Sequence, residues 1–370
     1  MPRKMKINYP TDRKEKTMKK LTSLVLSVLM LLTLLPAVFA EEAADGEVFS
    51  NSLFSLTIPA AYAGTYEVEV REKEICVYHK ASREADCGGF AFGVYVSDDP
   101  SQYSFLPGGR KVGELTSGDG TLYNVYLDHP TDVQYDFSSE EAIESYRVLY
   151  NADEEIVKLM KSTDGGVFVY GGGTKGEDLY GDVLAKHLQA VVEEWDPSRL
   201  EEENMSPVYY AIRMSSDGNP LERIGFAYHD VNSDGIEELL IGEIAEGAWK
   251  GVIYDVYTMV NREPVHVISG WERNRYFAYK FSFLCNEWSG GAALSGWTLY
   301  DLEPNSVELF PQVAFKYDGY ENADQPWFIA YGIDIENDVW ENVTEEEFNE
   351  RKATFEDYLR FDYTPLSAVA

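Results

Sequence analysis

The sequence lacks the short motifs that mark several common enzyme classes. It has no Gly-x-Ser-x-Gly elbow, no P-loop lysine, no His-Glu-x-x-His and no Cys-x-x-Cys. Histidine is also scarce, and its five residues are scattered one to a segment. His187 is predicted to face the core side of the helix that precedes Pro197. The sequence therefore predicts no catalytic residues. A carboxylate pair for glycoside hydrolysis stays open as an alternative, because 64 Asp and Glu residues make any pair available and none diagnostic.

Basic residues are few. The chain has 31 Lys and Arg against 64 Asp and Glu, a formal net charge of −33. Such a chain repels nucleic acid and anionic membranes and attracts divalent cations. The charge does not indicate disorder, because 45% hydrophobic and 14% aromatic residues supply a core. We therefore predict no nucleic-acid partner, and a length of 370 residues favours two domains.

One long apolar run stands near the N-terminus. Lys19 and Lys20 precede apolar residues 21–35, and small residues at 38 and 40 favour cleavage after Ala40. The alternative is a membrane anchor. The run is short for an anchor, however, and two glutamates follow it in place of a basic flank. Residues 1–40 are thus predicted to be a secretory signal peptide.

This signal peptide has two consequences. Its charged region begins at Met18, which is a better first residue of the protein than Met1. Residues 1–17 are therefore interpreted as upstream sequence. Residues 1–40 carry eight basic and two acidic side chains, so their removal takes the formal charge from −33 to −39. We expect a secreted, extracellular protein with no stable membrane anchor after cleavage.

Oxygen-bearing side chains recur at every second position in one acidic stretch. The pattern Asp-x-Asn-x-Asp-Gly-x-x-Glu matches the start of an EF-hand loop, with a glycine where the chain turns sharply. Oxygen ligands of this kind suit a hard cation, and we predict Ca²⁺ as the cofactor. The predicted ligands are Asp230, Asn232, Asp234, the backbone carbonyl of Ile236, and Glu238.

The rest of loop 230–241 departs from an EF-hand. Position 12 is Ile241, where a bidentate glutamate belongs. Residues 224–228 and 238–241 read as strands, so the motif resembles the strand–loop–strand calcium loops of integrin-like repeats more than helix–loop–helix EF-hands. The alternative is a plain Asp-Gly hairpin turn. Such a turn explains none of the other oxygen-bearing side chains. A single loop of this kind argues against a repeat array.

The three cysteines indicate no metal or nucleophile site. Cys76 and Cys87 flank one predicted hairpin, where they either form a disulfide outside the cell or stay as two separately buried thiols. Both alternatives remain open, because strand register is not readable from the sequence. Cys285 is left over and is predicted to be a buried thiol.

Residues 48–170 are predicted to form an N-terminal domain. Apolar side chains alternate along three segments, at residues 54–58, 66–70 and 90–96. Two helices follow. The first is expected to begin with a capping box made by Ser138 and Glu141. A strand pattern with appended helices predicts an antiparallel sheet with a few packed helices.

A glycine-rich linker at residues 171–177 separates this domain from a C-terminal domain at residues 178–363. The second domain is expected to start with a helix that ends at Pro197, followed by the calcium loop and a meander of short strands. A capping box at Thr344 begins its last helix. The sequence thus predicts an α+β fold of two domains, each an antiparallel sheet with a few packed helices.

The seven tryptophans all lie in the second domain or its leading helix. Most are expected in the core, because a sheet of short strands needs bulk to fill it. Trp249, Trp271 and Trp288 lie near glycine-rich turns and are the ones that we expect at the surface. Exposed aromatic rings stack on sugars or contact proteins, so we predict a carbohydrate or protein ligand.

The calcium loop and its flanks resemble the C-terminal domain of a loosely defined group of secreted proteins from Clostridia-type gut bacteria. The resemblance covers residues 179–363, and a segment at residues 130–134 is similar to domains found beside it. It implies calcium binding and secretion, and no reaction. Two function hypotheses follow: a non-enzymatic, calcium-stabilised extracellular binding module, which the missing motifs favour, or a secreted hydrolase with carboxylates in an interdomain cleft.

Overall fold

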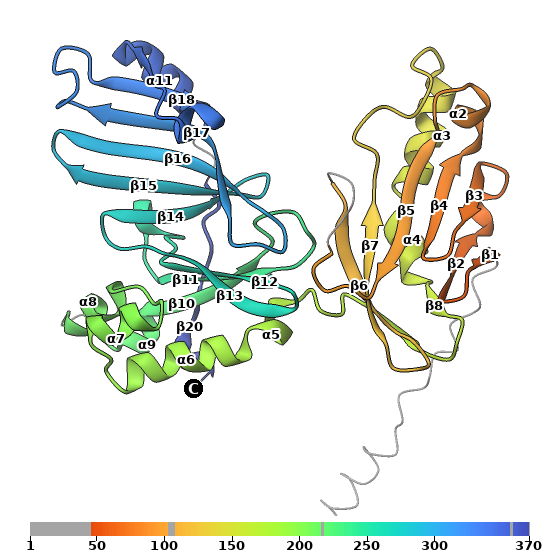
Figure 1. The fold of residues 1–370 in the computed structure, drawn as a ribbon, viewed down its shortest axis with the longest axis horizontal. Coiled ribbons are helices and arrows are strands. Elements are labelled where there is room, and N and C mark those ends of the chain that lie inside the picture. Colours follow the sequence, from red (N-terminus) through yellow and green to blue (C-terminus); the bar gives the residue numbers. More distant parts are fainter. Residues whose placement is uncertain (1–45, 103–107, 216–217, 356–357, 370) are drawn as a thin grey trace, which may run out of the picture.

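The computed structural model describes residues 46–102, 108–215, 218–355 and 358–369 (Figure 1). The predicted signal peptide at residues 1–40 lies outside these ranges. None of the helices within them has the length and apolar character that a bilayer crossing requires.

The described chain is mostly β-structure. It has 39% strand and 25% helix, arranged in four antiparallel sheets of three to six strands, which is closer to a β-sandwich than to an α+β fold. The predicted α+β class is therefore wrong. One reason is that several strands do not read as strands in the sequence: β15 (Phe283–Gly291) runs through Asn286, Glu287 and two glycines that indicated a turn.

The described part of the first half holds two sheets and three short helices (Figure 1). The smaller sheet has the order β1 (Gly46–Ser50), β2 (Phe54–Pro59), β8 (Lys161–Ser162). The larger has the order β3 (Tyr66–Val70), β4 (Glu74–His79), β5 (Phe90–Ser97), β7 (Leu122–Asp128), β6 (Arg110–Thr116), β9 (Val167–Tyr170). The helices are α2 (Lys80–Glu84), α3 (Glu140–Tyr150) and α4 (Asp153–Lys158), with a 3₁₀ turn η1 (Ala60–Tyr62).

The second half holds the other two sheets. The five-stranded sheet has the order β13 (Glu263–Ser269), β12 (Asp255–Val260), β11 (Glu238–Glu243), β10 (Ile224–His229), β20 (Thr364–Pro365). The six-stranded sheet has the order β14 (Asn274–Tyr279), β15, β16 (Leu294–Leu302), β17 (Leu309–Asp318), β18 (Trp327–Tyr331), β19 (Glu341–Val343).

Short helices precede and follow these strands. Those before the sheet are α5 (Gly176–Leu179), α6 (Gly181–Val192), α7 (Pro197–Glu202), α8 (Val208–Met214) and α9 (Pro220–Arg223). Later come α10 (Ile333–Glu336), α11 (Glu345–Ala353) and two 3₁₀ turns, η2 (Gly247–Trp249) and η3 (Leu366–Val369).

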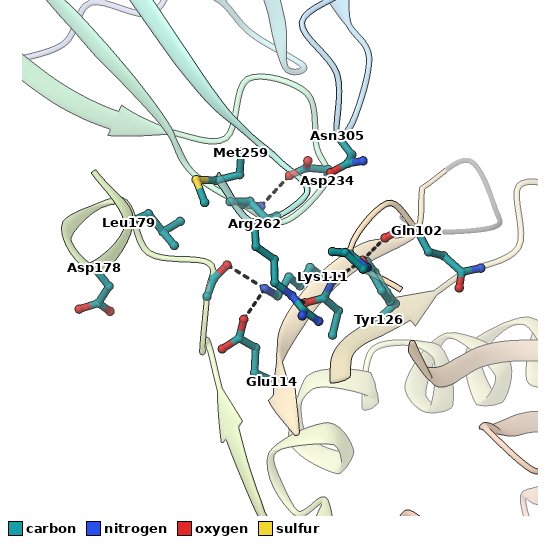
Figure 2. A pocket seen from close by; sticks show the side chains of 14 residues that line it. Gln102, Lys111, Glu114, Tyr126, Asp178, Leu179, Asp234, Met259, Arg262 and Asn305 are labelled. Atoms are coloured by element: carbon teal, nitrogen blue, oxygen red, sulfur yellow. Dashed lines mark hydrogen bonds and ion pairs between the residues drawn. The ribbon is translucent and has the colours of Figure 1, made fainter. Parts of the chain in front are cut away.

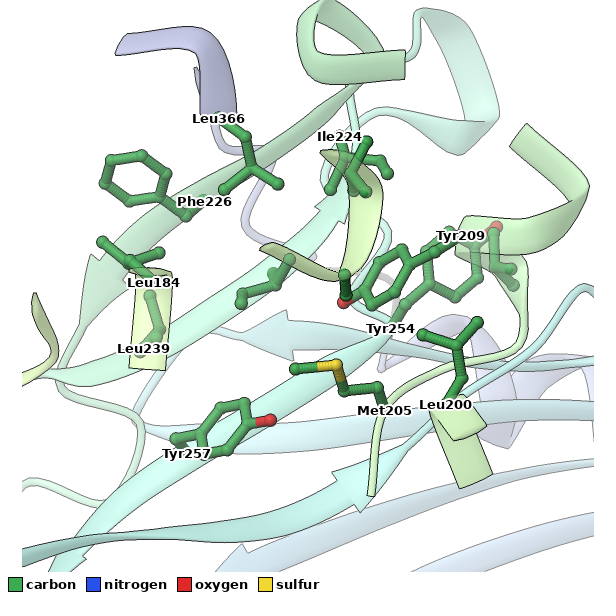
Figure 3. Packing of buried hydrophobic residues seen from close by; sticks show 14 of the residues in the cluster. Leu184, Leu200, Met205, Tyr209, Ile224, Phe226, Leu239, Tyr254, Tyr257 and Leu366 are labelled. Carbon is green, nitrogen blue, oxygen red and sulfur yellow. The ribbon is translucent and has the colours of Figure 1, made fainter. Parts of the chain in front are cut away.

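Strand β11 is buried on both faces. Its Leu239 and Ile241 pack among the side chains of α6 to α8, as Figure 3 shows for Leu239 beside Leu184. The intervening Leu240 points to the other face and joins Leu284 and other residues of the six-stranded sheet in a second core. Because neighbouring residues of a strand face opposite sides, this double burial explains the unbroken apolar run of β11. The helices and the six-stranded sheet therefore sandwich the strand that follows the predicted calcium loop.

The helix boundaries test the predicted caps. The capping box at Thr344 is confirmed, with both of its hydrogen bonds to Glu347 present, although α11 ends at Ala353, earlier than a helix to residue 359. The predicted box at Ser138 is wrong by one position. The side chain of Ser139 caps α3, whereas the Ser138 hydroxyl donates to Asp136 in the preceding turn.

Candidate metal centre

A tight hairpin carries the predicted calcium ligands. Strands β10 and β11 pair in antiparallel register with His229 opposite Glu238, so residues 230–237 form the connection between them. The predicted strand–loop–strand arrangement is confirmed.

Hydrogen bonds within the loop curl the chain around its oxygen-bearing side chains. Asp230 Oδ2 accepts from the backbone N–H of Gly235 at 3.0 Å, and Asn232 Oδ1 accepts from that of Asp234 at 3.1 Å. Asp234 Oδ1 accepts from the N–H of Ile236 at 2.7 Å. Gly235 has a φ of 87°, a conformation that glycine adopts without strain. The alternating acidic pattern thus builds one compact turn in which each ligand side chain is held in place.

Burial and mutual repulsion act on the carboxylates of this turn. Burial raises the pKa of Asp230 above its usual value. Burial, and then repulsion from Asp230, raises the pKa of Asp234 to about 7. Burial, and then repulsion from Asp234 and Asp230, raises the pKa of Glu238 well above its usual range. The three acids are therefore close enough to resist carrying negative charge together.

The lysines near the loop are engaged with other acids. Lys175 pairs with Glu237 at 2.8 Å, and Lys111 pairs with Glu114 at 2.9 Å. In the described part of the chain, no Lys or Arg forms an ion pair with Asp230, Asp234 or Glu238. The Lys111 ammonium still acts on Asp234, because its positive charge partly offsets the rise in the pKa of that carboxyl.

The Glu238 carboxylate fixes the start of the loop by hydrogen bonds. Its Oε2 accepts from the N–H of Val231 at 2.8 Å, and its Oε1 accepts from Thr258 Oγ1 at 3.0 Å. Among the described residues, no three His, Cys, Asp or Glu side chains are grouped so as to hold one metal ion. The set in this loop is two aspartates with the neutral oxygens of Asn232 and Ile236, which are the hard donors that Ca²⁺ prefers. The part of Glu238 as closing ligand stays a prediction.

The loop also contacts the first half of the chain, which sequence reasoning missed. The backbone N–H of Lys111 in β6 donates to the carbonyl of Asp234 at 2.6 Å. A cavity of about 310 Å³ opens beside this contact, and Figure 2 shows Lys111, Asp234 and Arg262 facing it from the two halves. The Arg262 guanidinium crosses the junction and donates to Asn124 Oδ1 at 3.3 Å. No local pattern signals these contacts, because their partners are more than 120 residues apart.

The predicted linker at residues 171–177 lies at the same junction. The N–H of Gly171 donates to the carbonyl of Val112 at 2.8 Å, and Lys111 Nζ donates to the carbonyl of Gly173 at 3.0 Å. Thr174 is buried, and its carbonyl accepts from the N–H of Glu237 at the end of the loop. The glycine run is therefore packed between the halves, and the division into two domains there stays a prediction.

The cysteines are free thiols in the structure. Cys76 is buried in β4, whereas Cys87 is half-buried in the turn that follows α2. The pair is thus present as two thiols, of which Cys76 alone is buried, so the alternative of two separately buried thiols holds for Cys76 and is wrong for Cys87. Helix α2 lies where the predicted hairpin was expected to turn. Cys285 is buried as predicted, and its burial raises the pKa of its thiol.

The tryptophans divide between core and surface. Trp249 and Trp271 are 41% and 43% exposed, as predicted, whereas Trp288 is half-buried. Trp195 and Trp297 are buried. The three near glycine-rich turns line separate hollows, of about 250 Å³ at Trp249, 510 Å³ at Trp271 and 310 Å³ at Trp288.

A second polar cluster lies beneath the hollow at Trp271. Asp255 in β12 is completely buried and accepts hydrogen bonds from the Ser269 and Tyr209 hydroxyls and from the Ser206 N–H. His266 Nε2 lies 3.0 Å from Ser269 Oγ. The sequence signal for this cluster was an aspartate inside an apolar strand.

This cluster is not built as a nucleophilic triad. In a triad the histidine stands between serine and aspartate and uses a different ring nitrogen for each. Here Ser269 donates directly to Asp255, and the same Nε2 of His266 lies 3.0 Å from Ser269 and 3.5 Å from Asp255. The arrangement fixes polar side chains at the base of a hollow.

No protein-family model, curated protein or solved structure matches this chain.

Proposed function

We propose that this protein is a secreted, non-enzymatic binding module whose loop at residues 230–238 holds Ca²⁺. The observation that carries the proposal is the geometry of one turn, in which Asp230 and Asp234 accept backbone N–H groups of the loop and lie near the buried Glu238. Among the described residues no Lys or Arg forms an ion pair with any of these three acids. The ligands would be Asp230, Asn232, Asp234, the carbonyl of Ile236, and Glu238.

Calcium would act here as a structural ion. It would remove the repulsion between Asp230, Asp234 and Glu238, which at close range in a buried site costs more than in water. Because Asp234 also accepts from Lys111, an ion that orders the loop would strengthen the contact between the two halves. We expect an affinity on the order of 10⁻⁴ to 10⁻³ M, as for extracellular modules, because the position-12 glutamate is missing.

The binding activity would reside in the exposed aromatic side chains of the second half. Trp249 and Trp271 each border a hollow of the surface. Exposed rings of this kind take part in binding carbohydrate or protein ligands. The acidic charge argues against nucleic acid as the partner.

The alternative is a secreted hydrolase with carboxylates in the cleft between the halves. The cavity there does contain Glu114, Asp178 and Asp234. Asp234 belongs to the loop, however, and Glu114 pairs with Lys111. Of the three carboxyl groups in this cavity, Asp178 is then the one left for catalysis, whereas hydrolysis of a glycoside uses two carboxyl groups. We therefore favour the binding module.

Thermal unfolding tests the calcium proposal. We expect about 10 mM Ca²⁺ to stabilise the folded protein by roughly 1 to 3 kcal/mol relative to chelator, because the ion binds only the folded loop. For a protein of this size that corresponds to an increase in Tm of about 1.5 to 4 °C. Mg²⁺ is expected to act poorly, because its small octahedral shell resists an irregular cage.

Two variants make this experiment specific. Asp234→Asn keeps the shape of a ligand and removes its charge, so the calcium response is expected to fall to near zero. Asp324→Asn makes the same change at an exposed acid far along the chain and is expected to leave the response unchanged. A wild-type Tm that is indifferent to calcium would reduce the loop to a plain hairpin turn.

A further inference from the structure

The hollow at Trp271 is the best-formed candidate ligand site outside the calcium loop. It measures about 510 Å³, within the range of small-molecule sites, and lies between the start of helix α7 and the end of strand β13. Its polar lining is supplied by Glu201, Asn204, His266 and Ser269. These residues come from two segments more than 60 positions apart, so the fold alone assembles the site.

The polar groups at the base are held by the buried cluster beneath them. Ser269 donates its proton to the completely buried Asp255, so Ser269 Oγ faces His266 Nε2 as an acceptor. His266 therefore carries its proton on Nε2, which leaves Nδ1 as an acceptor with no partner among the described residues. Tyr209 and the Ser206 N–H hold Asp255 from the other side. The base of the hollow is thus rigid and polar.

The rim of the hollow is apolar on one side. The Trp271 side chain is 43% exposed there, on a turn closed by hydrogen bonds between its backbone and that of Asn274 at 2.8 and 2.9 Å. Buried Met205 forms part of the wall. A ligand that fits must present an apolar face to an indole ring and hydroxyl groups to fixed acceptors and donors. A pyranose ring has both, because its C–H bonds and its hydroxyls point to different sides.

Charge selects among sugars. The whole chain has a formal net charge of −33, and the charged side chain at the hollow is the carboxylate of Glu201. An anionic sugar would meet repulsion from both. We propose that the hollow at Trp271 binds a neutral pyranose ring, with Trp271 as the stacking platform and Glu201, Asn204, His266 and Ser269 as hydrogen-bonding groups. This inference names the ligand class of the proposed binding module, and it rests on that function.

The test uses the full mature chain in calcium and four probes, the methyl glycosides of glucose, galactose, mannose and N-acetylglucosamine. Binding is followed by the indole N–H resonance of Trp271, which is assigned by its loss in Trp271→Phe. We expect at least one glycoside to shift this resonance at concentrations up to about 50 mM, since single sugar rings bind in the millimolar range. Glucuronate is expected to bind more weakly than methyl glucoside.

Variants locate the binding in this hollow. Trp271→Ala is expected to lower the affinity for the responding glycoside at least about tenfold, as measured by calorimetry. Trp271→Phe is expected to retain part of this affinity, because an aromatic ring remains. Phe137→Ala is the matched control. Its ring is also exposed but lies in the first half of the chain, so affinity is expected to stay unchanged.

Three outcomes would overturn the inference: no response to any of the four glycosides, binding that survives Trp271→Ala, or binding of choline in their place, which would make the hollow a cation site. The calcium melting curve is recorded on the same sample. A sugar response without a calcium response would refute the metal and keep the sugar site, and the reverse would refute the sugar site alone.

Discussion

At the scale of single residues, two titratable groups act in opposite directions on the pH dependence of folding stability. Burial raises the pKa of Asp234 to about 7, so its contribution favours the folded state in acid and is lost as the pH rises through 7. Burial lowers the pKa of His187 to about 4. His187 therefore favours the folded state above its unfolded pKa of about 6.5, and this contribution is lost as the pH falls toward 4. A bound cation would take over the role of the proton on Asp234.

The His187 effect is measurable as a pH dependence of stability. The side chain is completely buried on α6, as predicted for the core side of its helix, and its Nε2 lies 3.0 Å from the Tyr257 hydroxyl. Of the groups around it, Asp255 favours protonation, whereas His266 and Lys186 oppose it. Between pH 6.5 and 4 we expect the wild type to lose up to roughly 3 kcal/mol relative to His187→Gln, because the variant has nothing to protonate.

This comparison is made by urea unfolding in excess calcium, so that the loop carboxylates are in the same state in both proteins. Asp86→Asn, an exposed change in the first half, serves as the control and is expected to parallel the wild type. Equal pH slopes for the wild type and His187→Gln would show that His187 is already able to bind its proton in the folded state.

At the scale of elements, the β10–β11 hairpin has two tasks. It brings the predicted ligands together, and it presents its turn to strand β6 of the first half. Gly235 serves both tasks. Its φ of 87° closes the turn, and a Cβ at this position would clash with the backbone carbonyl of Lys111. The glycine of the predicted calcium pattern is thus also packed against the backbone of the first half.

Gly235→Ala tests this close approach. Gly64 is the matched control, because it has a φ of 83° and open space where a Cβ would stand. Gly64→Ala is expected to cost about 1 kcal/mol through backbone strain alone. We expect Gly235→Ala to cost about 1 to 2 kcal/mol more in chemical unfolding, because a backbone contact has to shift as well. Equal losses of unfolding free energy in the two variants would mean that the backbone at Lys111 shifts without an energetic cost.

At the scale of the whole molecule, the two halves have separate cores and meet at the loop. The first half packs around residues such as Phe92 and Leu115, and the second around the two faces of its five-stranded sheet. The connection between them is held by a hydrogen bond to the Val112 carbonyl and by hydrogen bonds from Lys111 and Glu237. Glu237 directly follows the predicted ligand Ile236, so ordering of the loop by calcium would also order the connection.

Limited proteolysis tests this coupling. In chelator we expect the first cut within residues 171–176 and two stable fragments, because loss of the ion frees the glycine run. In about 10 mM calcium the same cut is expected to be several-fold slower, as binding lowers the population of the open form. Cutting of an unrelated protein in the same digest serves as the reference for rate. A first stable cut inside either half would place the boundary elsewhere.

Local features of this protein were predictable from the sequence. The strands that flank the loop and the Thr344 capping box depend on near neighbours, so spacing alone determined them. The metal ligands stay a prediction. The hydrophobic period likewise placed His187 on the buried face of its helix. Even the exposure of Trp249 and Trp271 followed from adjacent turns.

The tertiary structure decided what depends on distant partners. The α+β prediction failed because helices cover one face of β11 and a second sheet covers the other, and no local pattern shows whether a helix or a sheet covers a face. The contact of Asp234 with Lys111 and the hollow at Trp271 join residues that are far apart along the chain. Spacing determines a turn and its oxygens, whereas only packing between segments determines which surface the turn touches and where a pocket forms.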